Sequence, residues 1–180
     1  MRSKTLAVTI FIVVLAVLVS VCQDALDGPR HIFQDSLLEN MVGSWNLNGQ
    51  IMHHDVIHSV DAQWVLNHQF LRIHEKATPA AKAVDLTYEA LVMVGYDNAS
   101  ERYVAHWMDI YGGRFSETLG FGKRSGNDIE FVFEYPDGPF HTTFRWKPDS
   151  DQWQWLMRGK NNNGKWFEFS DLTLVRIKDH

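Results

Sequence analysis

The chain has 180 residues, of which 45% are hydrophobic, and its formal net charge is −5 at pH 7. This length suits one domain with a hydrophobic core, preceded by a targeting segment. The acidic balance, without a cluster of basic residues, argues against nucleic acid and against anionic lipid headgroups as partners. The chain contains no glycine-rich phosphate-binding loop of either nucleotide-binding type. Seven Trp, eleven Phe and five Tyr favour a protein built from packed β-strands.

The first 22 residues predict export. Arg2 and Lys4 precede an apolar run from Leu6 to Val21, a pattern typical of a signal peptide or an N-terminal membrane anchor. Three alternatives stay open: cleavage near Ser20 to Cys22, lipid attachment at Cys22, or an uncleaved anchor. Each places the globular part in the periplasm or outside the cell, with the N-terminal segment as its only attachment to a membrane. Because Cys22 is the only cysteine, the exported domain has no disulfide.

Residues 23–40 predict a linker, with Asp27-Gly28-Pro29 at its centre, and then a short helix with Leu37 and Leu38 on its apolar side. Residues 41–178 predict a β domain. From Gly43 onwards, apolar and polar residues alternate with a period of two between short turn segments, which is typical of an antiparallel meander. The predicted turns lie at Asn67-His68, Asn98–Glu101, Gly112-Gly113, Ser125–Asn127, Pro136–Pro139, Pro148–Asp151 and Asn163-Gly164.

About ten strands follow from these turns, and no predicted helix is long enough to cover them, so the sheet should close on itself. The predicted fold is therefore all-β, a single up-and-down antiparallel barrel with a short N-terminal helix. The turns also predict which residues share the inner face. These are Met93, His106, Met108, Ile110, Phe115, Leu119, Phe121, Ile129, Phe131, Phe133, Phe144, Trp146, Trp153, Trp155, Met157, Leu172 and Leu174.

The first hairpin places Ala62 opposite Ile73 on the buried face. The turns also predict these pairings: Trp64 with Leu71, Tyr96 with Tyr103, Met93 with His106, Phe121 with Phe131, Phe131 with Phe144, Trp146 with Trp153, Trp155 with Leu172, and Met157 with Ser170. The same register places Trp107 and Asp109 on the outer face.

Three histidines, His53, His54 and His58, raise the question of a metal site. In a strand, His54 and His58 would lie about 13 Å apart, too far to share one ion. Val56 and Ile57 favour extended chain over a helical turn that would bring them together. The three are therefore interpreted as exposed polar residues, and no metal site is predicted.

Gly43-Ser44-Trp45 at the start of the first strand resembles the Gly-x-Trp signature of the calycin superfamily, which includes the lipocalins and fatty-acid-binding proteins. Three further segments are similar to an uncharacterised bacterial calycin-like family known only as a domain of unknown function. They are Ala62–Leu66 with Phe70-Leu71, Gly95–Asn98 with Tyr103-Val104 and Trp107–Asp109, and Leu172–Arg176. The resemblance implies a barrel and no particular activity. Distant calycin relatives bind haem or apolar molecules, but no residue here maps onto a haem ligand. We predict no cofactor and keep haem as an alternative.

A barrel of about ten strands is wider than side chains alone can fill, so an interior pocket is expected. Its predicted lining is His106, Met108, Glu117, Phe131, Thr142, Phe144, Trp155, Met157 and Ser170. His106 and Glu117 lie diagonally across one strand pair, about 7–8 Å apart, as a polar anchor for a ligand or as an acid–base couple.

The predicted function is an exported barrel that binds a small apolar or aromatic molecule. One alternative is an isomerase, cyclase or hydrolase that uses His106 and Glu117. Another is a structural or interaction module with a packed interior. An enzyme is not favoured, because the chain has no Gly-x-Ser-x-Gly elbow and no cysteine in the exported part. The sequence indicates neither the identity of the ligand nor the oligomeric state.

Overall fold

The structure, a computed structural model, describes residues 32–78, 87–161 and 163–178. The predicted export segment, residues 1–22, and the linker as far as residue 31 lie outside the described residues. Among the described residues, no helix has the length and apolar content to span a membrane. From Phe33 onwards the chain forms one compact unit.

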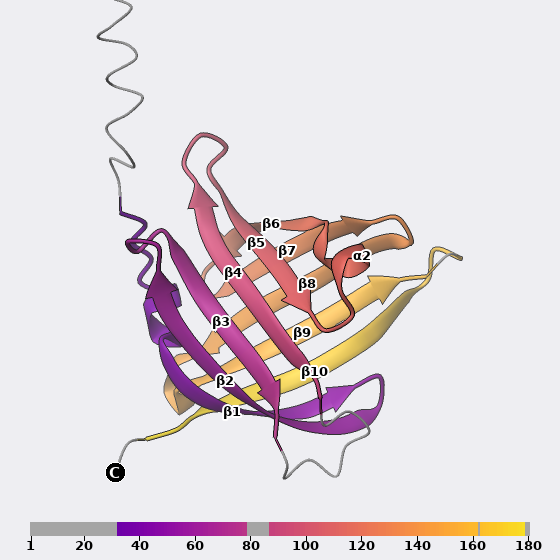
Figure 1. The fold of residues 1–180 in the computed structure, drawn as a ribbon, viewed down its shortest axis with the longest axis horizontal. Coiled ribbons are helices and arrows are strands. Elements are labelled where there is room, and N and C mark those ends of the chain that lie inside the picture. Colours follow the sequence, from indigo (N-terminus) through magenta and orange to yellow (C-terminus); the bar gives the residue numbers. More distant parts are fainter. Residues whose placement is uncertain (1–31, 79–86, 162, 179–180) are drawn as a thin grey trace, which may run out of the picture. The chain divides into compact units, whose positions relative to one another are not determined.

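This unit is a closed barrel of ten antiparallel strands, as predicted (Figure 1). Each strand pairs with its neighbours in the chain, and β1 closes the barrel against β10. The strands are β1 (Gly43–Ile51), β2 (His54–Val65), β3 (Phe70–Ala77), β4 (Glu89–Asp97), β5 (Arg102–Asp109), β6 (Leu119–Ser125), β7 (Asp128–Tyr135), β8 (Gly138–Lys147), β9 (Gln152–Lys160) and β10 (Trp166–Arg176). Helical structure in the described part is limited to η1 (Leu38–Met41), α2 (Gly113–Ser116) and η2 (Pro148–Ser150). The predicted N-terminal helix is thus a four-residue 3₁₀ helix.

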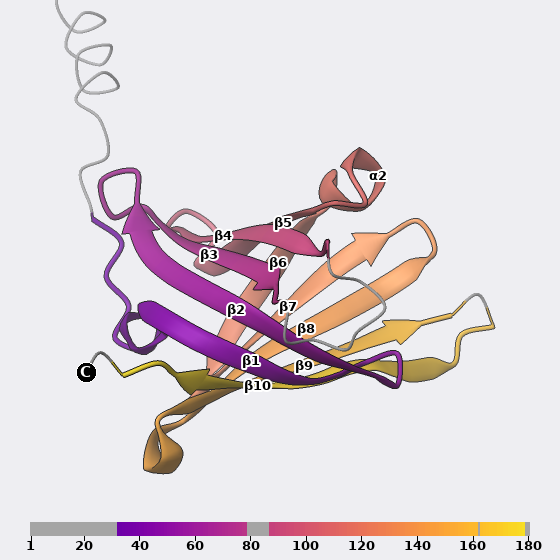
Figure 2. The same cartoon turned by 60° about the horizontal axis from the view of Figure 1, so that its bottom comes forward.

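Residues 33–41 cover the end of the barrel where β1 begins, which we call the capped end. Leu37, Leu38 and Met41 are fully buried in the core there. The opposite end, where β1, β3, β5, β7 and β9 finish, is the loop end. In Figure 2 the indigo segment marks the capped end at the left, and α2 lies at the loop end on the right.

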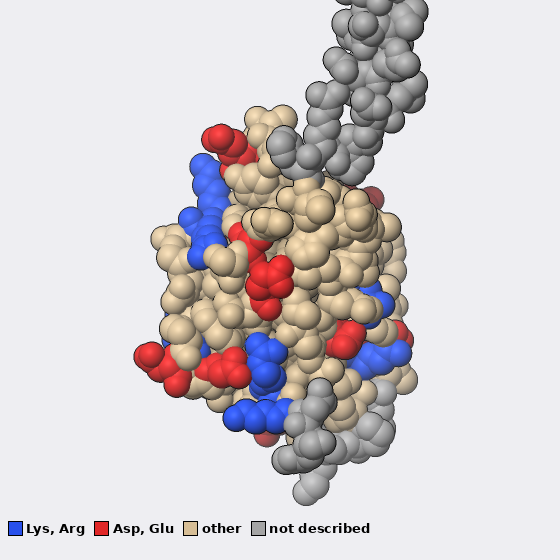
Figure 3. Space-filling model, turned by 90° about the vertical axis from the view of Figure 1, so that its left-hand side faces the viewer, with Lys and Arg blue, Asp and Glu red and all other residues tan. Residues whose placement is uncertain are grey.

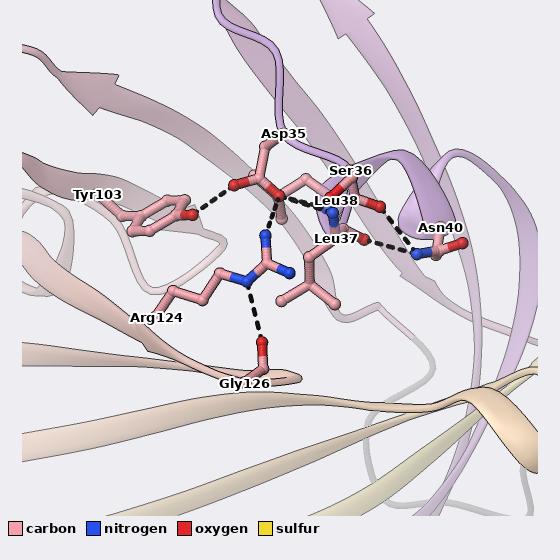
Figure 4. A network of polar contacts seen from close by, with 8 residues as sticks. All are labelled: Asp35, Ser36, Leu37, Leu38, Asn40, Tyr103, Arg124 and Gly126. Atoms are coloured by element: carbon pink, nitrogen blue, oxygen red, sulfur yellow. Dashed lines mark hydrogen bonds and ion pairs between the residues drawn. The ribbon is translucent and has the colours of Figure 1, made fainter.

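Asp35 fastens the cap to the barrel wall (Figure 4). Its carboxylate accepts hydrogen bonds from the backbone N–H groups of Leu37 and Leu38, at 2.8 and 2.9 Å. It also accepts one from the hydroxyl of Tyr103 on β5, and it lies 3.5 Å from the Arg124 guanidinium on β6. A buried carboxylate with this many donors is well compensated for its desolvation. The cap is therefore held to two strands by one side chain.

Most predicted pairings at hairpins are confirmed. They include Trp64 with Leu71, Tyr96 with Tyr103, Met93 with His106, Trp146 with Trp153, Trp155 with Leu172, and Met157 with Ser170. The pairing of Phe131 with Phe144 is wrong by two residues, since Phe131 lies opposite Thr142. A shift of two leaves every side chain on its predicted face.

The predicted pairing between β6 and β7 is wrong by one residue. The turn between the two strands is Gly126-Asn127, since Ser125 pairs with Asp128, and Gly126 has a φ of +61° that suits so tight a turn. Phe121 therefore lies opposite Val132, and Gly122 lies opposite Phe131. A slip of one residue exchanges the two faces of a strand. The predicted faces of β4, β5 and β6 are consequently wrong.

Glycines explain why this register packs well. A Cβ atom on Gly120 would lie 2.5 Å from the Phe133 ring, and one on Gly122 would lie 2.7 Å from the Phe131 ring. The two rings of β7 therefore lie flat over the bare backbone of β6 on the inner face. The larger residues Leu119 and Phe121 face outwards, where they are more than a third exposed. The large inward side chains of β7 thus lie opposite glycines of β6, which leave space for them.

Candidate functional site

Six of the nine predicted pocket residues lie on the inner face and are buried: Phe131, Thr142, Phe144, Trp155, Met157 and Ser170. The other three do not. His106 and Met108 face outwards on β5. The prediction placed them inside because it assumed a turn at Gly126 that is one residue too long. Glu117 is exposed and lies outside any strand, since the chain leaves β5 at Asp109 and forms α2.

The predicted couple of His106 and Glu117 is therefore not in the interior. His106 Nε2 donates a hydrogen bond of 2.6 Å to the Ser116 carbonyl, which ties α2 to the barrel wall.

A different histidine and glutamate form a buried pair. His58 on β2 and Glu75 on β3 face inwards, with Nδ1 and Oε1 2.5 Å apart and side chains 3% and 2% exposed. The interpretation of His58 as an exposed residue is wrong, whereas His53 and His54 are exposed as predicted. The period-two pattern contained the signal, because Ala62 and Ile73 were placed on the buried face and this face continues to His58 and Glu75.

Tyr88, just before β4, extends this pair. Its ring stacks on the His58 ring, with centroids 5.3 Å apart, and its hydroxyl is hydrogen-bonded to the side chain of Trp107 on β5. Burial raises the pKa of Tyr88 far above its usual value, and the negative charges of Glu75 and Asp109 raise it further. Tyr88 thus stays protonated and can act as a hydrogen-bond donor inside the barrel.

Asp109, the last residue of β5, lies at the loop end of the same wall. Burial raises the pKa of this carboxyl group, and a hydrogen bond of 2.9 Å from the backbone N–H of Tyr111 opposes the shift. Tyr135 on β7 has its pKa raised to about 12, chiefly by burial and also by the charge of Asp109. Asp109 is therefore close to both Tyr88 and Tyr135.

Two tryptophans connect opposite walls of the barrel. The rings of Trp107 on β5 and Trp155 on β9 meet edge to face, with centroids 6.3 Å apart, although three strands separate them in the sheet. Trp155 also stacks on Phe144 of β8, at 4.8 Å. The group of His58, Glu75 and Tyr88 is thus in contact, through Trp107, with the aromatic wall of β8 and β9.

On β9 and β10, two buried polar atoms have no hydrogen-bond partner among the described residues. They are Nε1 of Trp155 and Oγ of Ser170, in side chains that are 0% and 2% exposed. Ser170 faces inwards in phase with Leu172 and Leu174, and a bulge between Glu168 and Ser170 shifts the register of the preceding part of β10. An unpaired buried donor or acceptor costs about 1–3 kcal/mol, so these atoms mark a place where a hydrogen-bonding molecule would be favoured.

Residues 33–176, from the cap to the last strand, match the family model described as "Protein of unknown function (DUF1579)". The chain belongs to this family. A search of curated proteins found no match.

The DUF1579 match spans the cap and all ten strands, so the interior group described above lies within the family's own domain. The predicted likeness to a family of unknown function is confirmed at that level. A closed ten-stranded antiparallel barrel also suits a calycin-like fold, and membership of the calycin superfamily stays a prediction.

Within the described ranges, no three His, Cys, Asp or Glu side chains form a group that could bind a metal ion.

The outer face differs from the interior in how its charges are arranged. On the face drawn in Figure 3, acidic and basic side chains lie next to one another. Ion pairs on the outside include Arg72 with Asp61 at 2.9 Å and Arg145 with Asp128 at 2.7 Å. Exposed pairs of this kind contribute little to stability. In these two pairs the outer carboxylate has a cationic partner within the chain.

Proposed function

We propose that this barrel binds a small apolar or aromatic molecule in its interior, against the wall that carries Trp155 and Ser170. The observation that carries the proposal is the pair of unpartnered buried polar atoms on these two residues. Binding sites for small molecules are usually apolar and aromatic, with a few polar groups that orient the ligand. A ligand with a hydrogen-bond acceptor would satisfy the Trp155 N–H.

The width of the barrel supports the proposal. An eight-stranded barrel is just wide enough for side chains to fill it or for one small ligand, and this barrel has ten strands. Three inward positions also carry only a methyl side chain: Ala62, Ala90 and Ala105. Side chains this small favour an interior with room for a ligand.

The N-terminal 22 residues support a place of action outside the cytoplasm. In this proposal the barrel is exported and meets its ligand in the periplasm or outside the cell. The proposal includes no cofactor.

Native mass spectrometry of the protein purified from its host tests the proposal directly. We expect a small molecule that is present in the native spectrum and lost on unfolding. A second arm titrates the protein with 2-phenylethanol, which combines an aromatic ring with one hydroxyl, by calorimetry. A bare polypeptide mass together with no heat of binding would refute an interior ligand site.

Variants locate the site. Trp155→Phe keeps an aromatic ring and removes the indole N–H, so we expect it to weaken 2-phenylethanol binding about fivefold, as loss of one hydrogen bond does. Trp166→Phe is the matched control, because the Trp166 ring packs against His141 and Arg158 on the outer face. Equal effects of both variants would place the ligand elsewhere.

A second candidate function is an enzyme that moves a proton, favoured by the buried contact of His58 with Glu75. Glu75 contacts Nδ1, so a proton would pass through Nε2, with the Tyr88 hydroxyl as a neighbouring donor. Hydrogen–deuterium exchange into the co-purified molecule, lost in His58→Gln while binding persists, distinguishes this enzyme from a carrier.

A further inference from the structure

We infer that the molecule bound in this interior is a small organic cation, an aromatic or alkyl amine whose ammonium group lies between Glu75 and Asp109. The inference rests on the proposed function and specifies its ligand. Three features of the described residues carry it: an excess of negative charge, aromatic rings beside that charge, and an unpartnered donor on the facing wall.

Carboxyl groups outnumber basic groups in the loop-end half of the inner face. Glu75 and Asp109 point inwards from β3 and β5, and His58 is the one basic residue that accompanies them among the described residues. Arg114, at the same end, forms an ion pair with Asp137 at 3.2 Å. With both carboxyl groups ionised, the set keeps a net negative charge even when His58 is protonated.

Asp109 combines partial burial with the lack of a cationic partner in the described part of the chain. Among the described residues it forms no ion pair, and it accepts the backbone N–H of Tyr111. Burying a carboxylate without a partner is costly, which agrees with the raised pKa of this group. An ammonium ion beside Asp109 would remove that cost.

Two aromatic ring pairs each contain a tyrosine whose pKa the charge of Asp109 raises. Tyr88 and Tyr111 form one ring pair, with centroids 6.3 Å apart, and Phe115 and Tyr135 form another, at 6.4 Å. The Tyr135 hydroxyl donates to the Phe115 carbonyl at 3.2 Å, which fixes the second pair in place. Ring faces attract cations, and rings combined with a carboxylate are the usual receptor for amines and quaternary ammonium groups.

The unpartnered Trp155 N–H supplies an independent sign of a ligand. Trp155 is fully buried, and its ring contacts Trp107, whose side chain is hydrogen-bonded to Tyr88. A molecule with an ammonium group at one end and an aromatic ring or acceptor at the other would span from Asp109 to Trp155. One wall would therefore bind the ammonium group of the ligand, and the other wall would bind its aromatic ring or hydrogen-bond acceptor.

A matched pair of probes tests the inference: 2-phenylethylamine, a cation at pH 7, and 2-phenylethanol, its neutral counterpart. We expect calorimetry on the purified protein to show the amine binding about tenfold more tightly than the alcohol. Asp109→Asn keeps the shape and removes the charge, so it should abolish this preference and leave alcohol binding unchanged. Asp137→Asn, a rim carboxylate already paired with Arg114, should change neither.

Each other outcome is decisive. Equal binding of amine and alcohol by the unmodified protein would overturn the cation and leave an interior ligand site standing. Binding of neither probe, with a bare mass in the native spectrum, would overturn both proposals. An amine preference that survives Asp109→Asn and Glu75→Gln but not Asp137→Asn would place the cation on the surface, against the inference. Because the first comparison uses the unmodified protein, it holds even where a variant fails to fold.

Discussion

The buried contact between His58 and Glu75 predicts an unusual pattern of stability changes. Replacing one partner by leucine leaves the other polar group buried alone, and breaking a buried pair in this way costs about 3–5 kcal/mol. The exposures of 3% and 2% place this contact among buried pairs rather than surface ones. We expect His58→Leu and Glu75→Leu each to lower the free energy of unfolding by about that amount.

We expect the double variant, His58→Leu with Glu75→Leu, to recover the free energy of unfolding that each single variant loses. When both residues become leucine, no polar group is left unpaired, and such apolar replacements are neutral or stabilising by about 1–4 kcal/mol. The double variant should therefore be at least about 3 kcal/mol more stable than either single one. Since a domain of this kind is stable by about 5–15 kcal/mol, the single variants should still fold and be measurable.

A matched histidine–glutamate pair between the next two strands, β3 and β4, serves as the control. His74 and Glu89 have nearly the same separation, 2.6 Å between Nε2 and Oε1, but their side chains face outwards and are 23% and 48% exposed. Solvent screens this pair, so leucine at either position should hardly move the denaturation midpoint.

Urea denaturation, followed by circular dichroism at pH 7, measures all the variants. Single variants of His58 and Glu75 that shift the midpoint no more than the His74 and Glu89 controls would refute the reasoning. A double variant as unstable as the sum of the singles would refute it equally. A double variant more stable than the parent would indicate that the pair is kept for its chemistry in the interior.

Two further predictions concern the tyrosines and the cap. Burial raises the pKa of Tyr88, Tyr103 and Tyr135, so the unfolded chain loses these protons near pH 10 while the folded chain retains them. Stability should be full below pH 10 and fall above it, and tyrosinate absorbance that saturates near pH 10 in a still folded barrel would contradict this. Asp35→Ala should lower the free energy of unfolding by about 2–3 kcal/mol, because it removes the backbone and Tyr103 contacts of the cap. Arg124→Gln should cost less, since its contact is long and partly exposed; an equal loss in urea denaturation would assign the effect to the ion pair.

The sequence by itself determined the barrel and much of its wall. Turn residues at regular spacing and period-two alternation specify strand order, because a strand with one buried face tolerates only one register. Where a turn has a single geometry, as at Asn98–Glu101, the pairing of Tyr96 with Tyr103 follows directly. The inward positions of Phe144, Trp155 and Ser170 were likewise available from local pattern.

Tertiary structure alone decided the faces of β4 to β6 and the composition of the site. A single residue in the turn at Gly126 exchanges those faces, and the preference depends on how rings of β7 lie over Gly120 and Gly122, a contact between strands that no local pattern contains. Asp109 thereby moves to the inner face, where closure of the barrel brings it near Tyr88 and Tyr135. Hydrophobic periodicity specifies which residues are buried together, whereas the meeting of polar groups from separate strands depends on the closed three-dimensional packing.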